Sequence, residues 1–162
     1  MITQEENYKK DGWINVNLFI NEYSSIGKLP SKIEFTEGCK NINLRNLEEI
    51  PSEVVFNNNK NVILNMVDKI SSDVKFINGG DVKFYGCEFV PSNLNFNNYK
   101  DVILHSVKHI SENVIFNNKV NVELNPNEKV LFSEGVIFNS EGEVKYEFIK
   151  IPFNLNIKNF LN

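Results

Sequence analysis

Two histidines have the spacing that most resembles a metal-binding pair. His105 and His109 lie four residues apart in the stretch LHSVKH. On an α-helix this spacing places two imidazoles on one face, where they can bind a metal together. Here both histidines flank a predicted turn, and the sequence pattern aligns no carboxylate or thiol with them. The sequence therefore predicts two solvated histidines and no metal site.

The two cysteines are the next candidates for chemistry, as nucleophiles or as ligands. Cys87 occupies a position that is apolar elsewhere in the chain, as Leu47, Val67 and Val107. It is therefore predicted to fill the core, where cysteines are mostly inert. Cys39 lies in a longer turn and is expected to be more exposed, but no histidine aligns with it to form a catalytic dyad. Two cysteines are also too few for a disulfide scaffold.

Paired carboxylates could perform general acid–base catalysis. Asp81, Asp101 and Glu143 occupy equivalent positions, which Asn61 and Asn121 share. An alternation of Asp and Asn just before a strand is typical of side chains that cap a turn, because both bond readily to nearby main chain. With no acid cluster and no glycine-rich phosphate loop, the sequence predicts no catalytic residues, no enzymatic activity and no cofactor.

Positions can be called equivalent because the chain repeats itself. A phenylalanine recurs at intervals of 21, 20, 20, 20 and 22 residues, at Phe35, Phe56, Phe76, Phe96, Phe116 and Phe138. Apolar residues stand six and two positions before each of these anchors. A polar, asparagine-rich stretch follows, and then a second apolar pair such as Val62 and Leu64. A period of this length is typical of solenoid proteins.

Each repeat contains two apolar pairs with one residue between their members, which predicts two short strands with one buried face. The connections are too short for a substantial α-helix. Stacked repeats would bury a continuous core and pair equivalent strands in parallel. The predicted fold is therefore an all-β, right-handed parallel β-solenoid of about six and a half 20-residue coils with two short strands each. Its hand follows from the crossover rule.

The predicted boundaries follow from where the repeat fails. Residues 1–28 depart from the pattern and are expected to form an N-terminal cap with one atypical coil. Residues 29–157 form the solenoid and 158–162 a C-terminal tail, all within a single domain. One extra residue near Gly38–Asn41 and two near Pro126–Glu128 fall in predicted turns, which tolerate insertions.

The segments VILNMVDKISSDV, EIPSEV and FVPSNL resemble the short leucine-rich repeats of bacterial and phage proteins. Coils of that family carry an L-x-L strand, a later apolar residue and then L-P. The resemblance is one of pattern and covers roughly residues 29–157. The chain departs from the family in its turns, because the turn after the L-x-L strand is shorter by two residues. The resemblance implies a recognition surface and carries over no catalytic residue.

One set of polar residues is predicted to line up on the surface. It follows the last inward residue of the second strand in successive coils, and we call it the polar column: Arg45, Asn65, Tyr85, His105 and Asn125. Its composition, with an aromatic centre, is one that protein interfaces favour; an ordinary solvated column is the alternative. Outward β-branched residues would form a patch if they are contiguous, or else reflect strand propensity: Val55, Ile63, Ile103, Ile115 and Ile137.

The last apolar residues alternate with polar ones and predict a final amphipathic strand: Ile149, Ile151, Phe153, Leu155 and Ile157. A solenoid ends in an open strand edge, which invites pairing with another chain. Either this C-terminal edge pairs end-to-end in a homodimer, or Phe160 and Leu161 cover it.

Composition limits the partners. The formal charge of −4, with 17 basic residues, argues against general nucleic-acid binding. No apolar run is long enough for a membrane span, and the N-terminus lacks the apolar region of a signal peptide. The expected location is the cytoplasm of a bacterial cell or of an infected host, with export that uses no cleavable signal as an alternative.

The sequence thus predicts a non-catalytic module that recognises another protein. An effector, or a phage-encoded inhibitor of a host protein, is a specific form of this hypothesis that rests on analogy. One alternative is a carbohydrate-binding or carbohydrate-hydrolysing β-helix, with Tyr8, Tyr85 and Tyr99 as the aromatic candidates. Another is a structural module that assembles end-to-end through the final strand.

Overall fold

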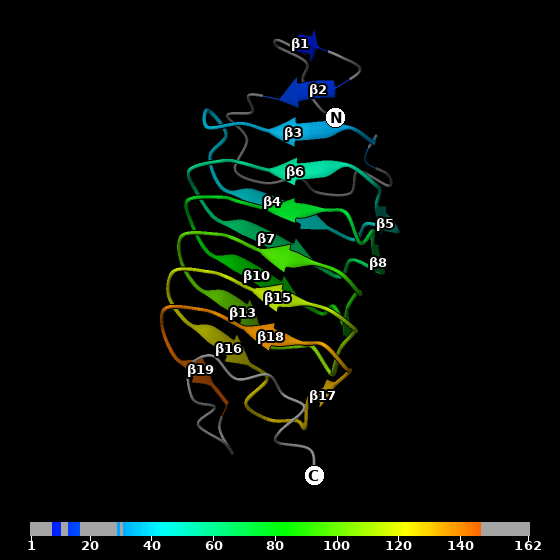
Figure 1. Ribbon diagram of the computed structural model, residues 1–162. Coiled ribbons are helices and arrows are strands. Elements are labelled where there is room, and N and C mark those ends of the chain that lie inside the picture. The colour runs from blue at the N-terminus through cyan, green and yellow to red at the C-terminus, as the bar shows by residue number, and fades with distance from the viewer. Residues whose placement is uncertain (1–7, 11–12, 17–28, 30, 147–162) are drawn as a thin grey trace.

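The computed structural model describes residues 8–10, 13–16, 29 and 31–146, and this part of the chain is all-β with no helix. Parallel strands stack about 20 residues apart in a solenoid of about six turns (Figure 1). In Figure 1 the near strands run to the left and the dimmer strands behind them run to the right as the chain descends. This path is right-handed, as the crossover rule predicts.

The strands form three faces. The first sheet is ordered β1 (Tyr8–Lys10), β2 (Trp13–Val16), β3 (Ile33–Phe35), β6 (Val54–Phe56), β9 (Lys75–Phe76), β12 (Asn95–Phe96), β15 (Ile115–Phe116) and β18 (Ile137–Phe138). The second sheet contains β4 (Ile42–Arg45), β7 (Val62–Asn65), β10 (Val82–Tyr85), β13 (Val102–Leu104), β16 (Val122–Leu124) and β19 (Val144–Lys145). The third face has two parts: β5 (Glu49–Ile50) with β8 (Lys69–Ile70), and β11 (Phe89–Val90) with β14 (His109–Ile110) and β17 (Leu131–Phe132).

The third face corrects the prediction of two strands per coil. Its strands are two residues long, and only one residue of each points inward, such as Ile50 or Val90. A strand with a single inward residue produces no alternation in the sequence, so the pattern predicted only an apolar corner there. Backbone pairing with the next coil, which the sequence does not display, makes these corners strands.

The strands pair so that equivalent residues of successive repeats lie opposite one another. Phe56 is paired with Phe35 on one side and Phe76 on the other, and the equivalent residues of later coils continue the row. Their rings stack with centroid separations of 4.8–5.1 Å and are 1% exposed or less. Offset aromatic stacking adds to the free energy of burying each ring. This internal stack is the centre of the hydrophobic core.

The asparagine-rich turn between the first and second sheets is held by side chains that reach the main chain. The second residue after an anchor is fully buried in four coils: Asn58, Asn78, Asn98 and Asn118. In Asn98 the Nδ2 group donates to the carbonyl of Gly80 in the preceding coil and to those of Lys100 and Asp101 in its own. We call residues 57–61, 77–81, 97–101 and 117–121 the asparagine turn. The sequence analysis did not single out its buried asparagines.

Four side chains of the column predicted to cap this turn do so: Asn61, Asp81, Asp101 and Asn121. Asp81 N donates to Asn61 Oδ1 at 2.9 Å, and Asn121 N donates to Asp101 Oδ1 at 2.7 Å. Each side chain thus bonds to the main chain of the next coil. The structure confirms the interpretation of this column as turn capping.

Both insertions lie in turns, as predicted. The distance in sequence from anchor to second strand is one residue longer in the first coil, between Phe35 and Ile42. The connection from β16 to β17 is two residues longer than its counterparts. Towards the N-terminus, β2 pairs with β3 in parallel and β1 pairs with β2 antiparallel. The predicted boundaries stay predictions, and the proposed C-terminal edge, Ile149–Ile157, lies outside the described residues.

Candidate functional site

Four members of the polar column share one line on the second sheet. Arg45, Asn65 and Tyr85 are paired directly across β4, β7 and β10. His105 follows β13, and its ring packs edge-on against Tyr85 with centroids 6.4 Å apart. Asn125 does not continue this exposed line. It is only 5% exposed, and its Oδ1 accepts a bond from Asn127 N at 3.0 Å because the inserted residues fold a turn back onto it.

The two histidines belong to different faces. His105 Nε2 lies 3.7 Å from Glu123 Oε2 beside the second sheet. His109 belongs to β14 on the third face, where its Nε2 lies 2.8 Å from Ser133 Oγ. The part of the chain that the structure describes holds no group of three or more potential metal ligands.

Both cysteines are buried in the core. Cys87 is 2% exposed, as predicted, and burial raises the pKa of its thiol. Cys39 is also 2% exposed, so the expectation of greater exposure was wrong. Its backbone N donates to Thr36 O at 2.9 Å, and the extra residue of the first coil therefore closes a turn that directs Cys39 inward.

The outward β-branched residues do not form one patch. Val55, Ile115 and Ile137 lie on the first sheet, whereas Ile63 and Ile103 lie on the second. Lys75 and Asn95 separate Val55 from the adjacent pair Ile115 and Ile137 on the first sheet. Lys83 separates Ile63 from Ile103 on the second sheet, and Ile103 is buried. Strand propensity is sufficient to explain these residues.

Three strongly exposed apolar side chains lie elsewhere, near the corner where the second sheet gives way to the third face. Met66 is 59% exposed, Phe89 55% and Leu131 56%. The sequence analysis missed Phe89 and Leu131 because they are the outward residues of third-face strands that it had not predicted.

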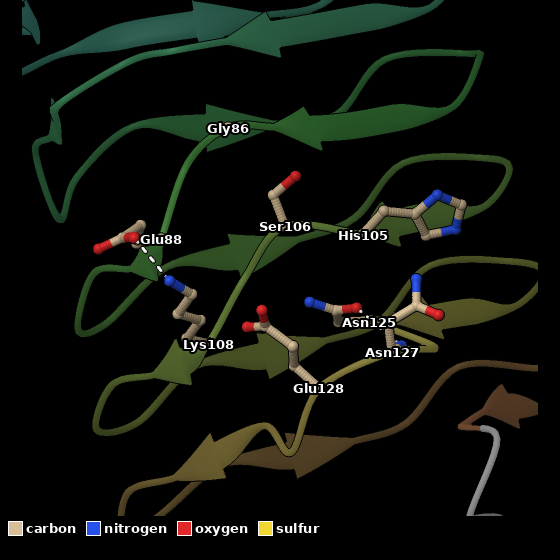
Figure 2. Close-up of a pocket in the computed structure, with 8 residues that line it drawn as sticks. All are labelled: Gly86, Glu88, His105, Ser106, Lys108, Asn125, Asn127 and Glu128. Atoms are coloured by element: carbon tan, nitrogen blue, oxygen red, sulfur yellow. Dashed lines mark hydrogen bonds and ion pairs between the residues drawn. The ribbon is translucent and has the colours of Figure 1, made fainter.

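A polar hollow of ≈ 330 Å³ opens at this corner over three coils (Figure 2). Figure 2 shows Glu88 and Lys108 at one side and His105 with Asn125 at the other. Lys108 Nζ bonds to Glu88 Oε1 at 2.8 Å. This bond and the negative charges of Glu88 and Glu128 raise the pKa of Lys108. The inserted turn supplies Glu128 to the lining, so the hollow exists where the repeat is irregular.

A second hollow, of ≈ 470 Å³, lies at the break in the third face between β8 and β11. A proline causes this break. Ser71 N donates to the carbonyl of Ile50 one coil earlier, at 3.0 Å. Ser111 N makes the same bond to Val90. Pro91 occupies the equivalent position and has no N–H to donate, so the ladder is interrupted there.

Together these features define one surface, which we call the corner strip. It comprises exposed side chains that line the two hollows, Asp68, Lys69, Glu88, Phe89, Lys108 and Glu128, and the exposed side chains of Glu48, Met66 and Leu131, which lie on the same coils but line neither hollow. Phe89 lines the second hollow, and Glu88, its neighbour in sequence, lines the first. Two members of the predicted polar column, His105 and Asn125, border this surface through the first hollow.

No family model, curated protein or solved structure matches this chain. Among the described residues there is also no helix of the length and apolar character that crossing a membrane requires. The function must therefore be argued from the surface itself.

Proposed function

We propose that this protein is a non-catalytic recognition module that binds another protein through the corner strip. The observation that carries the proposal is the exposed ring of Phe89, which lines the second hollow, together with Met66 and Leu131 on nearby coils, each of the three more than half exposed. Exposed apolar side chains that gather in this way commonly mark interaction sites. Binding energy concentrates where large anchors meet well-packed pockets.

The rigidity of the scaffold supports the same proposal. The strip is carried by short parallel strands whose register is repeated from coil to coil above a stacked aromatic core. The main-chain positions that carry its side chains are therefore fixed relative to one another before a partner arrives. Such preorganisation reduces the entropic cost of association. A cytoplasmic effector or phage-encoded inhibitor of a host protein is one specific form of this function, and it rests on analogy.

The test is photocrosslinking from defined positions. A photoreactive phenylalanine analogue is placed at Phe89 in the strip and, in a separate protein, at Tyr99, which is equally exposed but lies in the asparagine turn. Both proteins are irradiated in a lysate of the source organism. We expect one stoichiometric adduct from position 89 and none from position 99. Excess unlabelled wild type should suppress the adduct, and excess Leu131→Ser protein should suppress it less.

Equal labelling from both positions would contradict the proposal, because it would show non-specific contact. The same holds if no position in the strip yields an adduct while position 99 does.

Carbohydrate binding is a second candidate, since Tyr85 packs against His105, which lines the first hollow. Aromatic faces beside polar groups are suited to sugar rings. Glycan-array binding that disappears in Tyr85→Ala and persists in Phe89→Ser would favour this candidate over protein recognition. End-to-end assembly through Ile149–Ile157 stays a prediction, which sedimentation at rising concentration checks.

A further inference from the structure

Resting on the proposed function, the geometry points to the chemistry of the partner: we infer that the corner strip accepts a basic amphipathic helix of another protein. Lysine or arginine side chains would face the carboxylates of the strip, and apolar side chains would contact Phe89, Met66 and Leu131. The charges, the apolar contacts and the spacing of the coils each support this inference.

Acidic side chains outnumber the two basic ones of the strip, Lys69 and Lys108. Three successive coils place a carboxylate just before the third-face strand, at Glu48, Asp68 and Glu88, and all three are exposed. Lys108 takes this position in the next coil, and the inserted turn adds Glu128. Consecutive coils are joined by main-chain bonds at this point, from Asp68 N to Leu47 O and from Lys108 N to Glu88 O. The carboxylates therefore stand in one row.

The single lysine of this row does not neutralise it. Lys108 is bonded to Glu88 and also feels the charge of Glu128. Two carboxylates thus share one ammonium group, while Glu48 and Asp68 lie further along the row. A basic side chain that enters the first hollow would meet the carboxylate of Glu128. Exposed charges of this kind determine the choice of partner and the rate of encounter more than the affinity.

Apolar contacts accompany the acidic row. A Cβ at Gly86 would lie 3.1 Å from Met66 Cγ, so the Met66 side chain covers the corner beside that glycine. Phe89 contributes to the lining of the second hollow, and its ring packs edge-on against that of His109 with centroids 6.1 Å apart. A purely cationic partner would leave these surfaces in water. An amphipathic partner would bury them, and apolar burial supplies most of the affinity of such contacts.

The spacing suits a helix. Parallel strands lie about 4.8 Å apart, and one turn of an α-helix rises about 5.4 Å. Side chains one helical turn apart would therefore reach successive coils. Helices that dock in this way present an apolar stripe at every third or fourth residue.

The test uses two labelled peptides of about 15 residues with the helical spacing of an amphipathic segment. One peptide carries leucines on one face of the helix and lysines on the other. The second peptide is the same except that glutamate replaces every lysine. Fluorescence anisotropy measures their binding to the full chain. We expect the lysine peptide to bind, the glutamate peptide not to bind, and the affinity of the former to fall with added salt, because exposed charges are screened.

Two pairs of variants provide matched controls. Asp68→Asn with Glu88→Gln removes two strip charges, whereas Glu37→Gln with Glu141→Gln removes two exposed charges near the asparagine turn. Phe89→Ser removes an exposed ring from the strip, and Tyr99→Ser removes one from the asparagine turn. We expect each strip variant to weaken binding by roughly tenfold, and each control to leave it unchanged.

The inference is wrong if the glutamate peptide binds equally well or if strip and control variants behave alike. Its failure can be distinguished from that of the proposed function. A crosslinked partner at position 89, without binding of the lysine peptide, would retain protein recognition and reject the basic helix. If the protein bound glycans but neither a crosslinked protein partner nor the lysine peptide, both the basic helix and protein recognition would be rejected.

Discussion

The asparagine turn and the corner strip occupy two corners of the same coils, and their side chains differ in what they contact. In the asparagine turn, buried amides and capping carboxylates bond to the main chain of neighbouring coils. In the corner strip, carboxylates and apolar side chains face solvent around two hollows. Polar side chains that bond to the main chain close a turn, whereas side chains without that role remain exposed at the surface.

The irregularities of the repeat separate the two corners further. The connection between the first and second sheets, which contains the asparagine turn, keeps one length from the one between Phe56 and Val62 to the one between Phe138 and Val144. At the corner strip, Pro91 interrupts the third face and an insertion extends one connection. The asparagine turn thus lies where the repeat is regular, and the hollows lie where a proline or an insertion interrupts the repeat.

The largest expected effect is on the core that both corners share. Phe96→Ala removes a ring stacked between Phe76 and Phe116, each 5.1 Å away. We expect the free energy of unfolding to fall by about 3–5 kcal/mol, because the change loses buried area and leaves a cavity. Urea denaturation measures it, with Phe89→Ala as the exposed control. An equal loss in both variants would show that Phe96 is not a core anchor.

A smaller loss is expected in the asparagine turn. Asn98→Ala removes an amide that donates to three carbonyls. We expect a destabilisation of about 1–3 kcal/mol, since buried carbonyls would lose their donor. Asn97→Ala is the matched control, because its side chain is exposed and accepts one bond from Asn117 at 3.2 Å. If the two substitutions cost the same, the turn is not held by its buried amides.

At the corner strip, Pro91→Ser should change stability little. The serine would supply the missing N–H between β8 and β11, but the unfolded chain would gain the freedom that proline restricts. These effects oppose each other, so we expect the free energy of unfolding to change by less than about 1 kcal/mol. Hydrogen exchange provides the sharper measurement, because the amide at position 91 should be as protected as that of Ser111. Rapid exchange there would mean that the break has another cause.

The smallest effect concerns a single ionisation. Glu88→Gln should lower the pKa of Lys108, because the bond to Glu88 is the main reason for its elevation. The raised pKa favours the folded state below the ordinary lysine value of 10.5, and this contribution is lost only as pH rises through the folded-state pKa. No pH dependence from this pair is therefore expected near neutrality. NMR titration of Lys108 tests this, with Glu141→Gln, which affects Lys119 instead, as the control.

Much of the fold could be predicted from spacing alone. The Phe anchors and their paired apolar residues predicted the inward positions, and the Asp and Asn column predicted the caps. The polar column was aligned correctly as far as His105. The predicted alignment was wrong at Asn125, where an insertion changes the direction of the chain. Local alternation predicts a strand, but it does not predict the path of a turn whose length differs from its neighbours.

The sequence by itself determined the period, the inward columns and the parallel stacking, because each is encoded in residues close together in the chain and repeated. Only the tertiary structure decided the third face, the burial of Cys39 and the surface made by Phe89, Leu131 and the two hollows. These features depend on main-chain pairing between coils and on its interruption at Pro91. Such pairing joins residues some 20 positions apart, and hydrogen bonds of the main chain leave little trace in side-chain patterns.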